Sequence, residues 1–391
     1  MNKTLGLYIH IPFCRSKCAY CDFYSLPSAT AAAQAAYVEA LEATARKMEP
    51  LVAGKPITSV YLGGGTPSVL EPELFCRVMA MAHRFPVAPS AEITAEANPT
   101  PLPPTRMAVW HEAGINRVSI GMQSAVEAEL RAVGRRHTLA DVAAAVRSAR
   151  SAGIRNISLD LMLGLPGQTS ASVRTSLDAA LSLEPEHLSL YCLKLEDNTP
   201  LARQVESGRV CLPDDDQTAD WYLECCERLG AAGLAQYEIS NFAQPGKESR
   251  HNLRYWQRGE YLGIGAAAHS FLNGVRRFFP ADLQTFQRQA LSQALGWVED
   301  EPVNPAEETL MLSLRTTAGC CMAELSRVAG AASAAAVGQT LEQLMPTGLV
   351  VRTADGYALT PQGMLVSNTI LSDLFLRMEP SDEATANKRT I

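Results

Sequence analysis

Three cysteines lie close together near the start of the chain, in the run from Cys14 to Cys21, which reads CRSKCAYC. Thiolates are soft, anionic ligands, and three of them on one loop can converge on iron-sulfur iron or on zinc. The loop is too short for ordinary disulfides between its own cysteines. The spacing therefore predicts a soft metal centre.

Two kinds of metal centre remain open at this point. A structural zinc ion needs a fourth protein ligand, and the nearby candidates are Asp22, a hard ligand, and His10, which lies inside a predicted strand. A [4Fe-4S] cluster held by only three cysteines leaves one iron free to bind a molecule other than protein. The open iron is the functional hypothesis, and zinc is the structural alternative.

The cysteine run resembles the signature of the radical S-adenosylmethionine (SAM) enzymes, in which the open iron binds the amino and carboxylate groups of SAM. Tyr20, the aromatic residue before the third cysteine, also matches that signature. The stretch from Tyr8 to Cys14, YIHIPFC, narrows the resemblance to the coproporphyrinogen oxidase-like branch, which contains anaerobic oxidases and related heme chaperones. The resemblance covers nearly the whole chain and implies a [4Fe-4S] cluster held by Cys14, Cys18 and Cys21.

The composition is that of a folded globular protein, with 391 residues of which 47% are hydrophobic and 19% charged. A chain of this length is expected to hold more than one domain. The net charge of -7 argues against a general nucleic-acid binder, which needs a basic surface. No apolar run reaches the ~18 residues that span a bilayer, and the start lacks a signal-peptide pattern. We therefore expect a cytoplasmic protein, with peripheral membrane contact left open.

The ten cysteines of such a chain are expected to be reduced thiols. Those outside the run have apolar neighbours, so they are interpreted as small residues of the core. They are Cys76, Cys192, Cys211, Cys225, Cys226, Cys320 and Cys321.

From residue 5 to about 235 the sequence alternates β-rich runs with amphipathic helical patterns. The predicted strands are Leu5–Ile11, Ile57–Leu62, Glu92–Ala97, Arg117–Gly121, Asn156–Leu163 and His187–Leu193. The predicted helices are Ala31–Lys47, Pro72–His83, Thr105–Ala113, Leu139–Ala152, Ser170–Leu183 and Asp215–Leu229. Six βα units are too few for a closed eight-stranded barrel. The resemblance implies an α/β fold, with a partial (β/α)6 TIM-like barrel over residues 1–235 and its chemistry at the carboxyl ends of the strands.

Glycine and polar residues lie at the carboxyl ends of several predicted strands. A triple glycine, Gly63 to Gly65, follows the second strand, Glu96 ends the third, Gln123 follows the fourth, and Asp160 belongs to the fifth. Glycine lets a ligand lie against the backbone, and acidic groups are costly to bury unpaired. Several such groups together suggest a polar ligand. Each alone has a structural alternative, since the glycines could form a tight turn and Asp160 could cap a helix or pair with Arg155.

By resemblance, these positions bind SAM. Glu96 and Asp160 would accept hydrogen bonds from ribose hydroxyls or from the methionine ammonium group, and Arg135 can donate to a carboxylate. Lys194 and His269 are looser matches to the family pattern. The expected SAM-binding residues are Tyr8, Tyr20, Gly64, Gly65, Thr66, Glu96, Gln123, Arg135, Asp160, Lys194 and His269.

A histidine beside aromatic residues marks the segment 236–303, which is expected to connect two domains. The run HNLRYW begins at His251, and its aromatic residues could flank a flat macrocycle. If the run is helical, Arg250, Arg254 and Arg258 share one face and could meet two propionates. The run resembles a motif of the heme chaperones, although a lone histidine is more often structural. The resemblance implies heme binding by His251, Asn252, Tyr255 and Trp256.

From Asn304 the pattern changes to two or three helices, a hairpin over 348–360 that turns at Asp355 and Gly356, and a helix over 361–376. Helices with such a hairpin suggest a winged-helix-like domain over 304–378. Residues 305–375 contain three arginines, no lysine and six acids, so phosphate binding is not expected. We expect the domain to cover the barrel mouth or to dock a partner, and the tail 379–391 to be disordered.

Two departures from the oxidase pattern bear on function. The resembling oxidases carry a fourth cysteine where this chain has Phe23, and they have a longer segment ahead of the cluster loop. Both departures favour a heme chaperone, which by resemblance binds the cluster, SAM and heme and transfers heme to acceptor proteins. The alternative is an oxygen-independent coproporphyrinogen III dehydrogenase, which uses SAM and an electron donor in porphyrin biosynthesis. A zinc-stabilised binding module is a third hypothesis.

Overall fold

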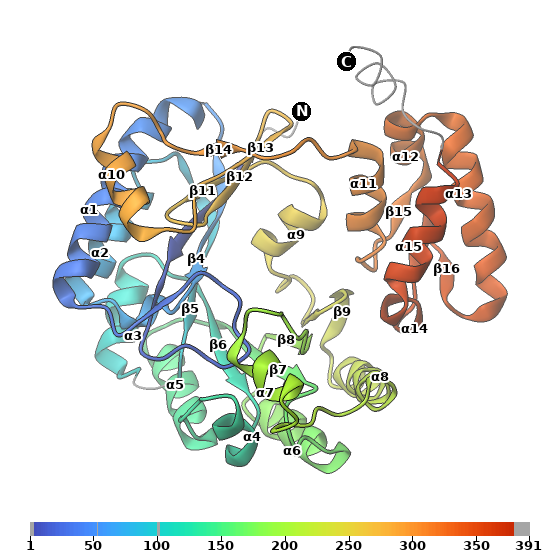
Figure 1. The fold of residues 1–391 in the computed structure, drawn as a ribbon, viewed down its shortest axis with the longest axis horizontal. Helices are drawn as coiled ribbons and strands as arrows, with labels where there is room; N and C mark the ends of the chain where they lie inside the picture. Colours follow the sequence, from blue (N-terminus) through green and yellow to red (C-terminus); the bar gives the residue numbers. More distant parts are fainter. Residues whose placement is uncertain (1–3, 53, 100–101, 379–391) are drawn as a thin grey trace. The chain divides into compact units, whose positions relative to one another are not determined.

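The computed structural model describes residues 4–52, 54–99 and 102–378. They form two compact units, each with its own hydrophobic core (Figure 1). The first unit comprises the described residues up to Leu234, together with Phe242–Arg254 and Gly259–Glu301. The second comprises Ala235–Asn241, Tyr255–Arg258 and the described residues from Pro302. Most of the segment 236–303 thus belongs to the first unit, and the predicted tail 379–391 lies outside the described residues.

Six strands of the first unit pair in parallel and in chain order, and helices connect them. The strands are β1 (Leu5–Ile11), β4 (Ile57–Gly64), β5 (Val87–Ala97), β6 (Arg117–Gln123), β7 (Asn156–Leu163) and β8 (His187–Cys192). The predicted helices are present as α1 (Ala31–Met48), α2 (Pro72–Ala82), α3 (Pro104–Glu112), α5 (Leu139–Ser151), α6 (Ser170–Ser182) and α8 (Asp215–Ala231). Figure 1 shows these helices on the outer side of the strands. The predicted fold class is confirmed.

The first unit also contains elements that the sequence analysis missed. Beyond β1 the sheet continues with β11 (Tyr261–Ile264), which is parallel to β1, and with the antiparallel strands β12 (His269–Leu272), β13 (Val275–Phe278) and β14 (Val298–Glu299). On the other side, β10 (Asn241–Ala243) lies beside β8. Shorter elements are β2 (Phe13–Cys14), β3 (Leu26–Pro27), α4 (Glu127–Ala132), α7 (Pro200–Glu206), α9 (Arg250–Trp256) and α10 (Leu283–Leu291). β1 is therefore flanked by β4 and by β11.

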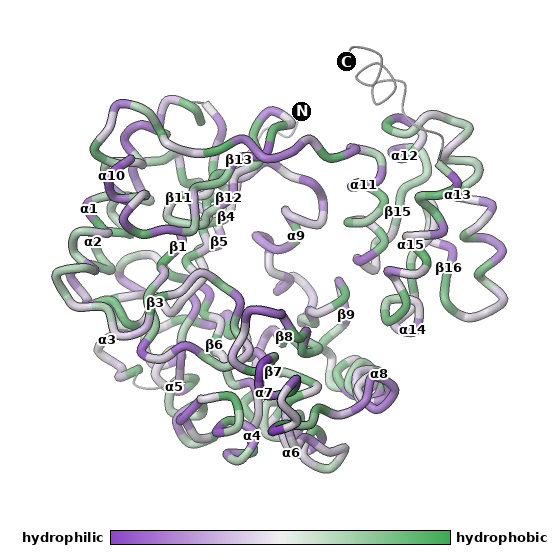
Figure 2. The backbone as a smooth tube through the Cα atoms, viewed as in Figure 1, coloured by the Kyte–Doolittle hydropathy of each residue, from purple (hydrophilic) through white to green (hydrophobic). Residues whose placement is uncertain are grey.

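Apolar and polar residues alternate along the parallel strands, and this alternation determines which side chains face the barrel interior. Leu7 and Ile9 of β1 are fully buried in the core that the strands share with helix residues. On the other face of the sheet, Tyr61, Glu96 and Ser119 line one pocket. Successive side chains of a strand point to opposite faces, so the apolar set packs under the helices and the polar set faces the barrel interior. In Figure 2, α1 and α8 alternate between green and purple, as amphipathic helices that cover a sheet do.

The second unit contains five helices and a small antiparallel sheet among its described residues, in addition to the short strand β9 (Ala235–Glu238). The helices are α11 (Pro305–Ser313), α12 (Met322–Ala329), α13 (Ala331–Leu344), α14 (Pro361–Leu365) and α15 (Ser367–Leu376). The sheet order is β15 (Cys320–Cys321), β17 (Gly356–Leu359) and β16 (Val350–Arg352). Strands β16 and β17 form the predicted hairpin, and Thr353 N–H donates to Gly356 O at its turn. The predicted helical, hairpin-bearing domain is confirmed.

The cysteines outside the cluster run are less uniformly buried than expected. All ten cysteines are free, and Cys225 and Cys320 are buried. Cys76, Cys192 and Cys211 are exposed instead, so their assignment to the core was wrong. Cys76 lies on a helix surface, Cys192 at a strand end and Cys211 in a loop. Their apolar neighbours in sequence did not reveal these positions. None of the helices in the described residues combines the length and the apolar character needed to cross a membrane.

The glycine run at the end of β4 brings the cysteine loop against the sheet. Gly65 N–H donates to Ile11 O at 2.9 Å, and Thr66 N–H donates to Phe13 O at 2.8 Å. A Cβ atom on Gly65 would lie 2.5 Å from Ile11 O and 2.8 Å from Phe13 O. These are backbone atoms, which cannot rotate away. Only glycine therefore lets β4 and the first residues of the cysteine loop approach this closely.

We expect Gly65→Ala to destabilise the protein by about 2 kcal/mol, because the added methyl group forces two backbone segments apart. Urea unfolding of the metal-free protein, followed by circular dichroism, measures this. Gly230→Ala is the matched control, since a Cβ atom there meets nothing within 4 Å. Its stability is expected to change by less than about 1 kcal/mol. Equal effects of the two substitutions would contradict the role of Gly65.

Candidate cluster and cofactor pocket

The carboxyl ends of the strands and the cysteine loop enclose one pocket of about 460 Å³. Cys14, Cys18 and Cys21 all line it. The loop is held in place by its main chain, because Ala19 N–H donates to Val133 O at 3.0 Å and Cys21 N–H donates to Cys18 O at 3.2 Å. The structure therefore brings the three predicted ligands to the strand ends, where the polar residues are.

The cysteine thiols differ in their surroundings. Burial raises the pKa of the Cys14 and Cys21 thiols. Cys14 Sγ lies 3.4 Å from Thr66 Oγ1. Cys18 Sγ accepts a hydrogen bond from Arg135 Nη1 at 3.4 Å, so a cation stands beside this sulfur. Thiols must lose their protons to bind a metal, so metal binding at this loop is coupled to proton release.

The spacing of the side chains tests the two metal centres that the sequence left open. Cys14, Cys18 and Cys21 line one pocket, whereas the candidate fourth ligands of zinc, His10 and Asp22, are not in its lining. A zinc ion needs its ligand atoms about 2.0–2.3 Å away, whereas a [4Fe-4S] cluster takes each thiolate on a different iron. Three thiols around one pocket therefore fit the cluster. His10 is also engaged elsewhere, with Nδ1 3.0 Å from Tyr8 Oη and Nε2 2.9 Å from Tyr24 O.

Glu96 lines the pocket, and its pKa is higher than that of an ordinary glutamate. Tyr61 Oη donates to Glu96 Oε1 at 2.9 Å, and Gly64 N–H donates to Oε2 at 3.2 Å. Burial outweighs these two donors and raises the pKa of Glu96 to about 7. A Cβ atom on Gly63 would lie 2.8 Å from the Glu96 carboxyl carbon, so the glycine run also makes room for this side chain.

Asp160 of β7 is a second half-buried carboxyl group in the pocket. It accepts a hydrogen bond from Ser119 Oγ at 3.0 Å and another from Ser189. Burial raises its pKa as well. The two structural alternatives, a helix cap and a pair with Arg155, are not what holds it. Its hydrogen-bond donors come from the strands on either side, β6 and β8.

The backbone of β6 is irregular where it meets the pocket. The pairing with β7 shifts register between Gly121 and Gln123, and Gln123 has a φ of 64°. A positive φ is uncommon for a residue with a side chain, and such strain clusters at functional sites. The bulge leaves both Gly121 and Gln123 lining the pocket.

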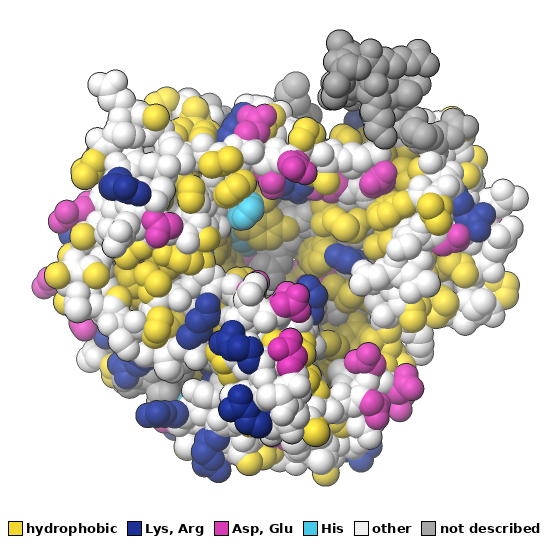
Figure 3. All heavy atoms as spheres, in the orientation of Figure 1, with side chains coloured by type: hydrophobic (Ala, Val, Ile, Leu, Met, Phe, Trp, Pro, Cys, Tyr) yellow, Lys and Arg dark blue, Asp and Glu magenta, His cyan; other side chains and the backbone are white. Residues whose placement is uncertain are grey.

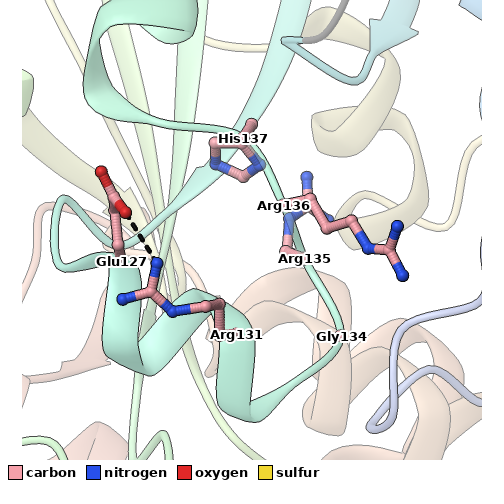
Figure 4. Close-up of a pocket in the computed structure, with 6 residues that line it drawn as sticks. All are labelled: Glu127, Arg131, Gly134, Arg135, Arg136 and His137. Carbon is pink, nitrogen blue, oxygen red and sulfur yellow. Dashed lines mark hydrogen bonds and ion pairs between the residues drawn. The ribbon is translucent and has the colours of Figure 1, made fainter.

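Arg135 separates this pocket from a second, outer one. Its Nη2 donates to Gly121 O at 2.7 Å, and it lines both pockets. The outer pocket is lined by Glu127, Arg131, Gly134, Arg135, Arg136 and His137 (Figure 4). Glu127 and Arg131 pair at 2.7 Å, and Arg136 extends away from that pair (Figure 4). The wall between the cysteine loop and this outer pocket includes the Arg135 side chain.

Most of the expected SAM-binding residues meet in the pocket, but two do not. Those that line it are Tyr20, Gly64, Gly65, Thr66, Glu96, Gln123, Arg135, Asp160 and Lys194. Tyr8 is not in the lining, and its ring stacks against Tyr61 with ring centres 6.4 Å apart. His269 is also outside it and stacks on Phe278 at 5.3 Å. Their contact with SAM stays a prediction.

The histidine of the HNLRYW run lies in the barrel wall. His251 is 1% exposed, its Nδ1 is 3.0 Å from Ser59 Oγ, and its ring stacks on Tyr61 at 5.2 Å. Glu92 accepts hydrogen bonds from the backbone N–H groups of Arg250 and His251. Burial lowers the pKa of His251 to about 3, which keeps the ring neutral.

Asn252, Tyr255 and Trp256 are half-buried, and no residue of the HNLRYW run lines the pocket. The contact of its residues with heme stays a prediction.

The expected face of three arginines is wrong. Helix α9 ends at Trp256, so Arg258 lies beyond it, where its φ of 53° turns the chain. Arg254 is 9% exposed and donates to Thr4 O and Thr58 Oγ1. The spacing of four residues was real, but the helix is too short to place all three on one face, and Arg254 is used by the fold.

Several pocket residues were missed by the sequence analysis. Tyr61 and Ser119 hold the two carboxyl groups, and Tyr191 and Cys192 end β8 at the pocket. The two-residue alternation of the strands could have found Tyr61, because it lies two positions before Gly63. Tyr191 carried no comparable signal, because the end of β8 lacks a glycine or an acid.

Comparison with known proteins places these observations in a family. The model of the Radical SAM superfamily matches residues 8–180, and that of the HemN C-terminal domain matches residues 301–366. The structure of coproporphyrinogen III oxidase (HemN) from Escherichia coli has the same fold, with a TM-score of 0.81 and 23% identity over 95% of this chain and 90% of that one. At that identity the likeness shows the fold alone.

Curated relatives share more of the sequence. Heme chaperone HemW of Bacillus subtilis (strain 168) is 36% identical over 93% of this chain and 97% of the relative. HemW of Mycobacterium tuberculosis (strain ATCC 25618 / H37Rv) is 34% identical over 95% of both. The mitochondrial radical S-adenosyl methionine domain-containing protein 1 of Mus musculus is 34% identical over 97% of this chain and 89% of the relative. The chain belongs to the HemW family of heme chaperones, within the radical SAM superfamily.

Proposed function

We propose that this protein is a heme chaperone that binds a [4Fe-4S] cluster and SAM in its pocket and passes heme to acceptor proteins. One observation carries the proposal: three cysteines and two half-buried carboxyl groups share a single pocket in a chain whose relatives bear the heme chaperone name. The ten free thiols support a reducing, cytoplasmic setting.

Cys14, Cys18 and Cys21 would hold the cluster. When bound, a reduced cluster with one open iron supplies an electron to SAM. An external electron donor must first deliver that electron to the cluster. Arg135 helps to position Cys18, because its guanidinium group donates to that sulfur. Thr66, which lies at the end of the glycine run, contacts Cys14. The residues that would hold the cluster and those that would hold SAM are therefore in direct contact.

The remaining pocket residues would bind SAM. Gly64, Gly65 and Thr66 offer backbone against which its methionine part can lie. Glu96 accepts hydrogen bonds from the amino group, and Asp160 accepts them from ribose hydroxyls. Arg135 also lines the pocket, and a guanidinium group can donate to a carboxylate. Tyr20, Gln123 and Lys194 also line the pocket, with Lys194 exposed at its mouth, whereas Tyr8 and His269 lie outside the lining.

The alternative is the oxidase activity. The pocket brings together three cysteines and several polar residues that an oxidase would also use for the cluster and SAM, although Phe23 stands where the oxidases have a fourth cysteine. An anaerobic assay separates the two. The reconstituted protein is given SAM, a strong one-electron reductant and coproporphyrinogen III, and protoporphyrinogen IX is followed together with heme transfer to an apo-cytochrome. Transfer without protoporphyrinogen formation supports the chaperone, and protoporphyrinogen formation without transfer would overturn it.

Cys18→Ser is expected to remove most of the cluster, because serine is a poor ligand for iron-sulfur iron. Visible absorbance, with iron and sulfide analysis after anaerobic reconstitution, measures the loss. Cys76→Ser is the control, since Cys76 is exposed and lies outside the pocket. It should keep the full iron and sulfide content. A Cys18 variant with intact cluster content would remove this residue from the ligand set.

The binding of SAM should depend on the charge of Glu96. Glu96→Gln is expected to weaken SAM binding about tenfold near pH 8, where the wild-type carboxyl group is ionised and accepts stronger hydrogen bonds. Since the pKa of Glu96 is raised to about 7, the difference between wild type and variant should shrink toward about pH 6, as the wild-type group takes up a proton. Calorimetric titration at both pH values measures the ratio, and a ratio that does not change with pH would contradict this assignment.

A further inference from the structure

Two exposed aromatic side chains stand at the mouth of the pocket. Phe23 is 69% exposed and Tyr191 is 40% exposed, and both line the pocket. Burying a phenylalanine side chain stabilises a fold, so leaving one open to water forgoes that gain. Phe23 belongs to the loop that follows β1, and Tyr191 to the end of β8. The two residues thus come from the two ends of the six-strand parallel series.

Two lysines lie on the same rim. Lys17 Nζ donates to Phe23 O at 3.0 Å, which holds the ammonium group beside the aromatic residue. Lys194 also lines the pocket, and its exposed Nζ pairs with Glu196 at 2.7 Å. In Figure 3, dark blue Lys and Arg side chains gather on the part of the first unit where Figure 1 draws the loop after β1. The mouth thus carries two aromatic side chains and two ammonium groups, one of which is paired with a carboxylate.

The acidic groups of the pocket lie apart from this rim. Glu96 and Asp160 are the only carboxyl groups among the described residues that line it, and both are hydrogen-bonded to groups of the barrel strands. Asp22, Glu196 and Asp197 lie near Lys194, so a negatively charged ligand must compete with them for its ammonium group. A SAM molecule would occupy much of the 460 Å³, so a second ligand of this pocket would lie over its mouth.

We infer that Lys17, Phe23, Tyr191 and Lys194 form a binding site for a flat, conjugated ring with carboxylate side chains, which is the chemistry of heme with its propionates. Aromatic faces cover the apolar ring, and the ammonium groups receive the carboxylates. One carboxylate must displace Glu196 from Lys194. The inference rests on the proposed function and places the heme over the cofactor pocket, away from the HNLRYW run.

The test compares heme binding to the reconstituted, SAM-loaded protein and its variants by absorbance titration. Phe23→Ala is expected to raise the Kd for heme about tenfold, because the ring loses an aromatic face. Lys17→Gln is expected to weaken heme binding while leaving the binding of heme dimethyl ester unchanged, since the ester carries no carboxylate. The controls are Leu291→Ala, an exposed apolar side chain of α10, and Lys247→Gln, both outside the pocket lining.

His251→Asn provides the competing arm, because asparagine keeps a polar partner for Ser59. If this variant loses heme and the two rim variants do not, the site lies at α9 and the inference is overturned. Unchanged affinity in all three variants overturns it as well, and so does equal wild-type affinity for heme and its ester. Failure of the wild type to bind heme at all would count against the proposed function. Circular dichroism and cluster absorbance verify that each variant is folded and loaded.

Discussion

Two backbone hydrogen bonds, from Gly65 to Ile11 and from Thr66 to Phe13, hold the functional region together. They extend the pairing of β1 and β4 past the ends of the strands, so that the chain leading into the cysteine loop is fixed to the sheet. Without these two hydrogen bonds, the cysteines would lie on a surface loop that is not fixed next to the carboxyl groups of the barrel. The bonds require a residue without a side chain at Gly65, because any Cβ atom would meet two carbonyl oxygens. The cluster loop and the cofactor pocket are one structure for this reason.

The polar interior of the barrel creates a second constraint. Ser59, Ser158 and His187 are all buried there. Buried polar groups are costly unless they find partners, so neighbouring strands supply them, as Ser158 does for His187 at 2.8 Å. His251 completes this arrangement from outside the sheet by bonding Ser59 and stacking on Tyr61, which in turn holds Glu96. A residue that sequence motifs associate with heme therefore supports the carboxyl group at the cofactor pocket.

The parts of the molecule that the sequence predicted well are those set by local pattern. Alternation of side chains marked the six parallel strands, and cysteine spacing marked the loop. The positions of the strand ends followed from these two patterns, so Glu96 and Asp160 could be identified as candidate pocket residues from the sequence alone. Patterns of this kind do not record where a helix stops or what packs against it, which is why Arg258 was placed on a helix that ends at Trp256. The same limit applies to Cys192 and to β11–β14, whose positions depend on contacts with residues distant in sequence.

One of these distant contacts affects the order in which the protein can be completed. β1 is synthesised well before β11, yet β11 is one of its two neighbours, and Leu7 pairs with Leu262. Forming a contact between segments so far apart in the chain is slow, because the conformational entropy of the chain between them is lost before the contact stabilises the fold. The strand that carries the cysteine loop therefore has an unpaired edge until most of the chain has left the ribosome. The loop therefore becomes fully rigid late in folding, well after its cysteines have been synthesised.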